Sequence, residues 1–143
     1  MAWKFHALGD VAEIRRARGE KYPAGTIYIQ VSATHGKIEM LEEEGTLEGK
    51  YAVIIPKIDV VPLYFFNMLT RAAPEFMHKY VGKNINIQVG DLRHMKVRLH
   101  DSFETQLAIC EVFRKIDEAV EHDERIIETL KETKKVALHN MFV

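Results

Sequence analysis

The sequence predicts an α+β fold, in which a small lobe of mixed strands and helices is followed by one long C-terminal helix. Up to about residue 100, short stretches of alternating apolar and polar residues, typical of half-buried strands, are interspersed with helical stretches. From Asp101 to the end there is no glycine and no proline. We therefore divide the chain into a globular lobe, residues 1–100, and a helical appendage, residues 101–143.

The N-terminal part begins with a predicted helix and a basic loop. Residues 8–16 predict a short helix that starts near Asp10 and is buried through Val11 and Ile14. The arginine-rich and lysine-rich residues that follow include two glycines and a proline before residue 26. This composition predicts an exposed basic loop.

The middle of the chain supplies the predicted sheet. Strands are expected at residues 26–32, 38–41, 51–55, 84–89 and 96–99. The stretch 51–55 is apolar throughout, so we place it inside the sheet. Residues 34–37 predict a turn, residues 42–45 an acidic loop and residues 90–93 a helical turn. Residues 60–80 are rich in large apolar side chains and predict a helix that is broken or shifted before Pro74 and packs on the sheet.

The C-terminal stretch carries an apolar seam with alternating spacings of three and four. The seam consists of Ile109, Phe113, Ile116, Val120, Ile127, Leu130, Ala137 and Met141, with Asp123 and Lys134 as its only clear polar interruptions. Such a heptad pattern is typical of a helix that packs lengthwise against another helix. The helix would be roughly 55 Å long, which is more than a lobe this small can cover. Asp101 followed by Glu104 predicts its N-cap.

Length and composition limit the class of protein. The 143 residues, 47% hydrophobic and 29% charged, predict one compact domain with an appendage. No apolar run is long enough to span a bilayer and no signal-peptide pattern is present, so we expect a cytoplasmic protein. The single cysteine, Cys110, is interpreted as a small apolar filler of the helix.

Charge is distributed unevenly behind a net value of −1. Residues 1–37 carry a net charge of +3 and residues 51–100 a net charge of +4, whereas residues 38–50 and 101–143 each carry −4. A basic lobe suits a polyanion, and an acidic helix suits a protein partner.

Catalytic motifs are not evident in this sequence. There is no glycine-rich phosphate-binding loop, no nucleophile elbow and no paired histidines at metal-ligand spacing on one helix face. His94 and His100 lie six residues apart across a predicted strand, which is a weak metal signal. The motifs therefore favour a binding or scaffolding protein over an enzyme, with no catalytic or metal-binding residue.

Three stretches carry a resemblance to a known family. They are residues 8–14 (Leu-Gly-Asp-Val-Ala-Glu-Ile), residues 90–97 (Gly-Asp-Leu-Arg-His-Met-Lys-Val), and the long helix from Gln106 through Asp117 to the closing Asn140-Met141-Phe142. In these stretches the chain resembles a half-length specificity (S) subunit of type I restriction–modification systems. The first stretch is similar to the opening of a target-recognition domain, and the last is similar to the family's spacer helix.

The resemblance implies a mechanism. A full S subunit has two recognition domains, each of which recognises half of a bipartite DNA target, and two long helices that pack antiparallel and set the spacing. Methyltransferase (M) subunits, which use S-adenosylmethionine, dock on those helices, and the nuclease–translocase (R) subunits join them. A single-lobed chain is then expected to form a homodimer through an antiparallel coiled coil. The chain itself would need no cofactor.

Candidate site residues follow from this combined interpretation. We expect DNA contacts from exposed basic and polar residues of three segments: Arg15, Arg16, Arg18 and Lys21; Thr34, His35 and Lys37; and Lys79, Lys83 and Asn84. We expect the partner helix to be contacted by Ile109, Phe113, Ile116, Val120, Ile127, Leu130 and Met141.

Two alternatives remain open from the sequence. A truncated relative could bind a full S subunit or a methyltransferase without recognising DNA itself. Its support is the short lobe and the sequence at the start of the helix, where the prolines and the Glu-Gln pair usual in the family are replaced by His-Asp-Ser-Phe-Glu-Thr-Gln at residues 100–106. An unrelated small-molecule enzyme is the other alternative, which the missing motifs disfavour.

Overall fold

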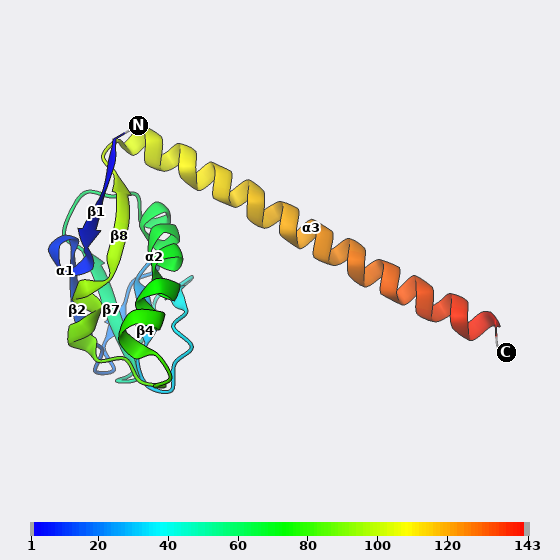
Figure 1. Ribbon diagram of the computed structural model, residues 1–143, viewed down its shortest axis with the longest axis horizontal. Helices are drawn as coiled ribbons and strands as arrows, with labels where there is room; N and C mark the ends of the chain where they lie inside the picture. Colours follow the sequence, from blue (N-terminus) through cyan, green and yellow to red (C-terminus); the bar gives the residue numbers. More distant parts are fainter. Residues whose placement is uncertain (1, 142–143) are drawn as a thin grey trace. The chain divides into compact units, whose positions relative to one another are not determined.

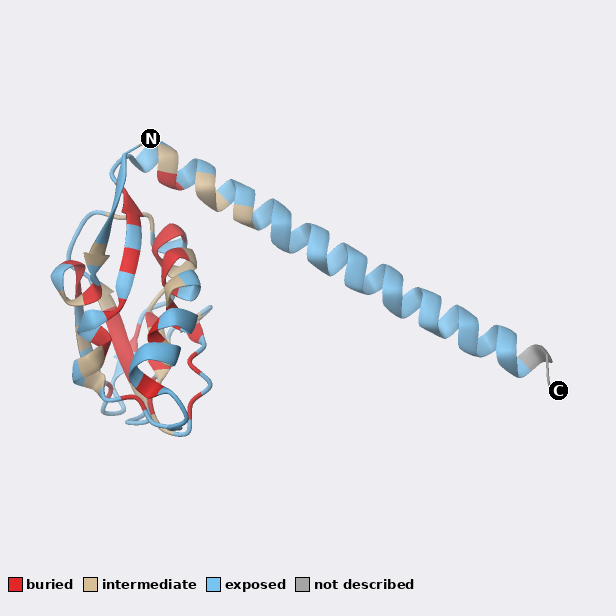
Figure 2. Cartoon of the chain, viewed as in Figure 1, coloured by how far each residue is buried: buried red, intermediate tan, exposed pale blue. Residues whose placement is uncertain are grey.

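The computed structural model describes residues 2–141, and this part of the chain forms two compact units that divide between Ala108 and Ile109 (Figure 1). The first unit contains mixed sheets and helices, and the second is the remainder of one long helix. The predicted α+β class is confirmed. The buried side chains gather in the first unit (Figure 2).

The main sheet has four antiparallel strands in the order β2-β7-β4-β5. They are β2 (Ala12–Arg16), β7 (Tyr51–Pro56), β4 (Ile27–Gln30) and β5 (Ile38–Met40). Strand β7 is paired on both edges, and its Ala52, Val53 and Ile54 are at most 1% exposed. The interior position predicted for this apolar stretch is therefore confirmed.

Strand β2 corrects the predicted helix at residues 8–16. Only Leu8–Val11 is helical (α1), and the chain then becomes extended. Strand β7 is apolar on both faces and must be paired on both edges, and Ala12–Arg16 is the segment that pairs with its second edge. Tertiary pairing therefore overrides the helical preference of this short sequence.

A second, two-stranded sheet joins the two ends of the lobe. Strand β1 (Trp3–Ala7) pairs antiparallel with β8 (Lys96–His100), from Trp3 opposite His100 to Ala7 opposite Lys96. The sequence predicts β8 but not β1. A third, minimal ladder pairs β3 (Lys21–Tyr22) with β6 (Gly45–Thr46).

Helix α2 (Pro62–Phe76) packs against β8 and β5, and it is not broken before Pro74. Proline removes one backbone donor, but the helix continues to Phe76 and then widens into a π-helical turn, Met77–Val81 (η1), that closes with Gly82 N–H donating to the carbonyl of Met77 at 2.8 Å. The predicted break or shift before Pro74 is therefore wrong, since the helix changes only after Phe76. The predicted turn at residues 90–93 is confirmed as the 3₁₀ helix η2 (Val89–His94).

The strand predicted at residues 84–89 does not form. Ile85 and Ile87 bond only to the irregular segment after β4, through Thr34 N–H to the Ile85 carbonyl and Ile87 N–H to the Val31 carbonyl. That segment leaves the extended conformation at Ala33, where φ is +50°. With no continuous neighbouring strand, a ladder cannot extend, and Ile87 is buried whereas Ile85 is 60% exposed.

The long helix α3 (Phe103–Met141) begins two residues later than Asp101. Ser102 is the residue that caps it, because its Oγ accepts the N–H of Thr105 at 3.4 Å and its carbonyl accepts the N–H of Gln106 at 2.9 Å. The predicted N-cap at Asp101 is therefore wrong by one residue.

The first turns of α3 are fixed to the lobe by a buried amide. Gln106 is 4% exposed; its Nε2 donates to the carbonyl of His100 at 2.8 Å, and its Oε1 accepts the N–H of Val61 at 2.9 Å. His100 is itself buried, with its Nδ1 2.7 Å from the hydroxyl of Tyr64, which also accepts the backbone N–H of His100 at 2.8 Å. This network connects β8, α2 and α3 within the first unit.

The stability of the lobe is expected to fall on acidification because of His100. Burial, reinforced by Arg98, lowers the pKa of His100 from its ordinary value. The unfolded chain therefore binds a proton more readily, so this stability is fully present above about pH 6.5 and is lost as pH falls towards the folded-state pKa. When the pH is lowered from 7.5 to 5, the Tm of the native protein should fall by about 2–4 °C more than the Tm of the His100→Asn variant. Substitution of the exposed His122 by asparagine is the control, and an equal loss in His100→Asn would contradict the assignment.

Candidate nucleic-acid interface

One predicted DNA-binding segment, residues 34–37, forms an irregular loop on the lobe. Thr34 is 8% exposed and its Oγ1 accepts the N–H of Gly36 at 2.9 Å, so this hydroxyl shapes the loop. Gly36 has φ +77° and lies against the side chain of Met77. His35 and Lys37 are exposed on either side of it. The loop thus presents two of the three predicted side chains.

The structure brings this loop against a second predicted segment. Thr34 N–H donates to the carbonyl of Ile85 at 2.7 Å, and Ala33 N–H donates to the Asn86 side-chain oxygen at 3.0 Å. Residues 33–37 and 77–87 are therefore neighbours, and we call them the paired loops. Their exposed predicted residues are His35, Lys37, Lys79, Lys83 and Asn84.

The N-terminal arginines do not form one group. Arg15 and Arg16 lie in strand β2 and not in a loop, so their side chains leave opposite faces of the sheet. Arg15 is exposed, with its guanidinium carbon 5.9 Å from the centre of the Tyr22 ring. Arg16 donates to the carbonyl of Gly49 at 2.5 Å and to Ser32 Oγ at 3.2 Å. Arg16 therefore connects the backbone at Gly49 with Ser32, the residue that precedes the first of the paired loops.

The other two basic residues of this group have acidic neighbours. The backbone N–H of Arg18 donates to the Glu20 carboxylate, and the ammonium of Lys21 lies 3.6 Å from the Glu44 carboxylate. Lys21 and Glu44 are both largely exposed, so the pair contributes little to stability. The acidic loop at residues 42–44 nevertheless reduces the positive field around Lys21.

Sequence reasoning missed the two amides that support the paired loops. Gln30 Nε2 donates to the carbonyl of Ser32 at 2.7 Å and to that of Ala33 at 3.2 Å. Asn86 holds the N–H of Ala33 from the other side. The only sequence signal was an amide at each position, in stretches that were interpreted as ordinary alternating strands.

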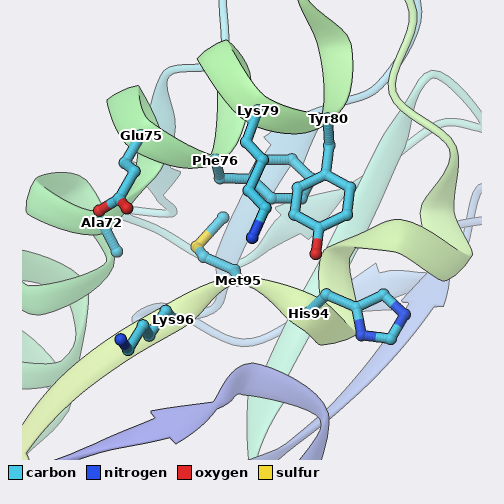
Figure 3. A pocket seen from close by; sticks show the side chains of 8 residues that line it. All are labelled: Ala72, Glu75, Phe76, Lys79, Tyr80, His94, Met95 and Lys96. Carbon is cyan, nitrogen blue, oxygen red and sulfur yellow. The ribbon is translucent and has the colours of Figure 1, made fainter.

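A small pocket lies beside the paired loops, between the α2–η1 segment and the start of β8. It measures about 50 Å³ and is lined by Ala72, Glu75, Phe76, Lys79, Tyr80, His94, Met95 and Lys96 (Figure 3). The rings of Tyr80 and His94 stack at 5.9 Å between centroids, and Lys79 lies 5.5 Å from the Tyr80 ring centre. This volume has room for a few water molecules.

Among residues 2–141, no three His, Cys, Asp or Glu side chains lie close enough together to hold a metal ion. Within the same residues, no helix is both long and apolar enough to cross a membrane.

The predicted seam on α3 is largely open to solvent. Ile116, Val120, Ile127 and Leu130 are 49–63% exposed. Ile109 and Phe113 are half-buried. The side chain of Met141 lies outside the described residues. The part of the seam from Ile116 to Leu130 therefore presents its apolar side chains to solvent.

The chain thus combines a lobe that carries exposed basic loops with a long helix that carries an exposed apolar seam. The chain belongs to the family of type I restriction modification DNA specificity domains, whose family model matches residues 16–132. The resemblance seen in the sequence is therefore confirmed.

Solved structures show the same fold at low sequence identity. The HsdS subunit from Thermoanaerobacter tengcongensis matches with a TM-score of 0.66 and 16% identity over 83% of this chain and 38% of that chain. The type I S subunit from M. genitalium matches with a TM-score of 0.66 and 11% identity over 85% of this chain and 41% of that chain.

A third similar structure comes from work on complex assembly and conformational transition of the type I R-M system. Its TM-score is 0.77 at 17% identity, over 94% of this chain and 43% of that chain. This chain thus spans about two fifths of each of these three relatives. No curated protein sequence matches it.

Proposed function

We propose that this chain recognises one half of a bipartite DNA target as a specificity subunit of a type I restriction–modification complex. The paired loops would contact DNA through His35, Lys37, Lys79, Lys83 and Asn84. The observation that carries the proposal is that two segments hydrogen-bond to each other, through residue pairs 51 and 53 positions apart in sequence, and leave their cationic side chains exposed. Arg15, Arg18 and Lys21 would add peripheral phosphate contacts.

The long helix provides the assembly part of the proposal. Two copies would pair antiparallel through the α3 seam, because an exposed apolar stripe in water is stabilised by a second such stripe. Methyltransferase subunits would dock on the paired helices, and nuclease subunits would bind that complex. Catalysis and S-adenosylmethionine binding would belong to the methyltransferase partner, since members of this family specify the site and do not modify it.

Selection of duplexes from a random-sequence pool by the purified full chain tests the proposal. Enrichment of a two-part motif with two-fold symmetry is expected, since two identical lobes would recognise identical half-sites. Lys37→Ala/Lys79→Ala should weaken binding to the selected duplex. It should also reduce the slope of log affinity against log salt by about 2 per lobe, if each lysine neutralises one phosphate.

Lys115→Ala/Lys135→Ala is the matched control, because it removes the same charge from exposed positions of α3 that lie off the seam. It should keep the salt slope of the native chain. Failure to enrich any motif, or an unchanged slope in the loop variant, would refute DNA recognition by the paired loops. A chain that binds the methyltransferase but enriches no motif would match the interaction-partner alternative.

A further inference from the structure

The two charged residues in the α3 seam carry information about how that helix pairs. With heptad positions a at Phe113, Val120, Ile127, Lys134 and Met141, the d positions are Ile109, Ile116, Asp123, Leu130 and Ala137. Asp123 and Lys134 are thus one d residue and one a residue. Both are exposed, and neither takes part in any of the ion pairs found among the described residues.

Heptad geometry restricts an antiparallel pair to a few alignments. In such a pair, each a residue packs in the same layer as a d residue of the partner helix, so the helices can slide only by whole heptads. Three alignments overlap over most of the seam. They place Asp123 opposite Val120, Ile127 or Lys134 of the second copy.

Only the third alignment avoids burying unpaired charge. The first two place Asp123 against an apolar side chain twice, once for each copy, which costs desolvation without compensation. The third places Asp123 opposite Lys134 twice, Val120 opposite Ala137 twice and Ile127 opposite Leu130 twice. Polar pairs in an otherwise apolar seam are known to fix alignment at some cost in stability.

The flanking residues agree with the third alignment. In an antiparallel pair the e positions of the two helices face each other, and here these are Asp117, Glu124, Lys131 and Leu138. The third alignment brings Glu124 beside Lys131 of the second copy. The first alignment would bring Glu124 beside Asp117 twice, and the second would bring Glu124 beside Glu124 as well as Asp117 beside Lys131 twice. The third is therefore the alignment of the three in which no like charges face each other at the e positions.

The exposure of the seam side chains in the single chain also agrees with the third alignment. In the third alignment the overlap runs from residue 116 to residue 141, so Ile109 and Phe113 fall outside it. These two are the half-buried seam residues, whereas Ile116, Val120, Ile127 and Leu130 are 49–63% exposed. The alignment therefore covers the apolar side chains that are still open.

We propose that α3 pairs with α3 of a second copy of this chain in one alignment, selected by two symmetric contacts between Asp123 and Lys134 and supported by Glu124 with Lys131. The inference rests on the homodimer of the proposed function and adds the residues that determine its geometry. Because the alignment sets how far apart the two helix starts lie, these charges would also determine the spacing of the assembly.

Charge exchange in the full-length chain tests the alignment. Asp123→Lys places Lys against Lys, and Lys134→Asp places Asp against Asp, so each single variant should dimerise roughly 100-fold more weakly, about tenfold for each of two symmetric contacts. A 1:1 mixture of the two single variants should form a heterodimer with native affinity, since both contacts are then Lys against Asp. The double variant should form a native-like homodimer. Light scattering across a dilution series measures the dimerisation affinity of the two single variants, of their mixture and of the double variant.

Glu121→Lys and Lys135→Asp are matched controls, because they make the same charge changes at exposed b positions off the seam. They should dimerise like the native chain. Single variants that remain native dimers, or a mixture that remains monomeric, would overturn the alignment. A monomeric native chain would overturn pairing with a second copy altogether.

A distance measurement distinguishes the three alignments directly. A spin label on Lys115→Cys, in a Cys110→Ser background, should lie about 40 Å from its counterpart along the helix axis, against about 30 Å or 20 Å for the other two alignments. The shorter distances would refute the proposal.

DNA selection tests the proposed function independently of the alignment. A dimer that enriches a motif but whose affinity does not respond to the charge exchange refutes only the alignment. A chain whose dimerisation follows the charge exchange but that enriches no motif refutes only the function.

Discussion

An Ile127→Glu chain is expected to be a monomer at concentrations where the native chain is a dimer. Ile127 lies at the middle of the exposed α3 seam and is 52% exposed in the single chain. Pairing would bury it, so the variant would have to bury two carboxylates per dimer among apolar side chains. At about 2 kcal/mol each, this weakens dimerisation by roughly 1,000-fold.

Loss of the dimer should then weaken recognition of the two-part DNA target. Two linked lobes bind a duplex with an advantage of about 100-fold or more over a single lobe, because the second contact becomes intramolecular. The variant should therefore bind a full site and a half-site with similar affinity. Light scattering measures the loss of the dimer, and titration of the full-site and half-site duplexes measures the change in DNA affinity.

Val136→Glu is the matched control for this variant. Val136 is also on α3 and is 58% exposed, but it lies off the seam, so the same carboxylate there stays in water after pairing. It should leave dimerisation unchanged. If Val136→Glu separates the copies and Ile127→Glu does not, the seam is assigned to the wrong face of the helix.

Gly36→Ala is expected to destabilise the lobe by about 3 kcal/mol. The backbone φ of +77° costs a non-glycine residue about 1–2 kcal/mol. A Cβ there would also lie 2.4 Å from Cγ and 2.7 Å from the sulfur of Met77, so the π-helical turn or the loop must move, at a further cost of about 1–2 kcal/mol. Urea unfolding followed by circular dichroism measures the change.

Gly19→Ala separates the two causes. Gly19 has φ +87° but nothing within 4 Å of the added carbon, so it should lose only the backbone contribution of about 1–2 kcal/mol. Combining Gly36→Ala with Met77→Ala should recover about 1–2 kcal/mol relative to the sum of the single changes, because the collision is removed. Equal losses at both glycines and no coupling with Met77 would contradict contact between the paired loops.

Pairing between segments far apart in the sequence explains why several predicted elements differ from the structure. Residues 12–16 and the missed strand β1 take their conformation from partners far along the chain, such as Trp3 opposite His100. Residues 84–89 alternate like a strand, yet the neighbouring segment turns away at Ala33, and only isolated hydrogen bonds form. The local sequence pattern does not determine whether a strand from a distant part of the chain lies alongside to pair with a segment.

The candidate interface likewise depends on contacts that the sequence pattern does not determine. Lys37 and Lys79 could be selected from the sequence as exposed cations, but their segments become neighbours only through Thr34, Gly36 and Met77 in the folded lobe. Arg16 was selected with them and instead holds Gly49 and Ser32. Whether a surface arginine is free or engaged depends on which backbone carbonyls reach it, which spacing along the chain does not determine.

By itself the sequence predicted the strands at 26–32, 38–41, 51–55 and 96–99, which form at 27–30, 38–40, 51–56 and 96–100, and the long helix with its apolar seam, because these depend on periodicity within one segment. The family was indicated by the resemblance of three stretches of the sequence, and the family model confirms it. The tertiary structure alone decided the pairing of β1 with β8, the extended state of Ala12–Arg16 and the meeting of the paired loops. Each of these depends on contacts between segments distant in sequence, whose free energy exists only once the chain has folded.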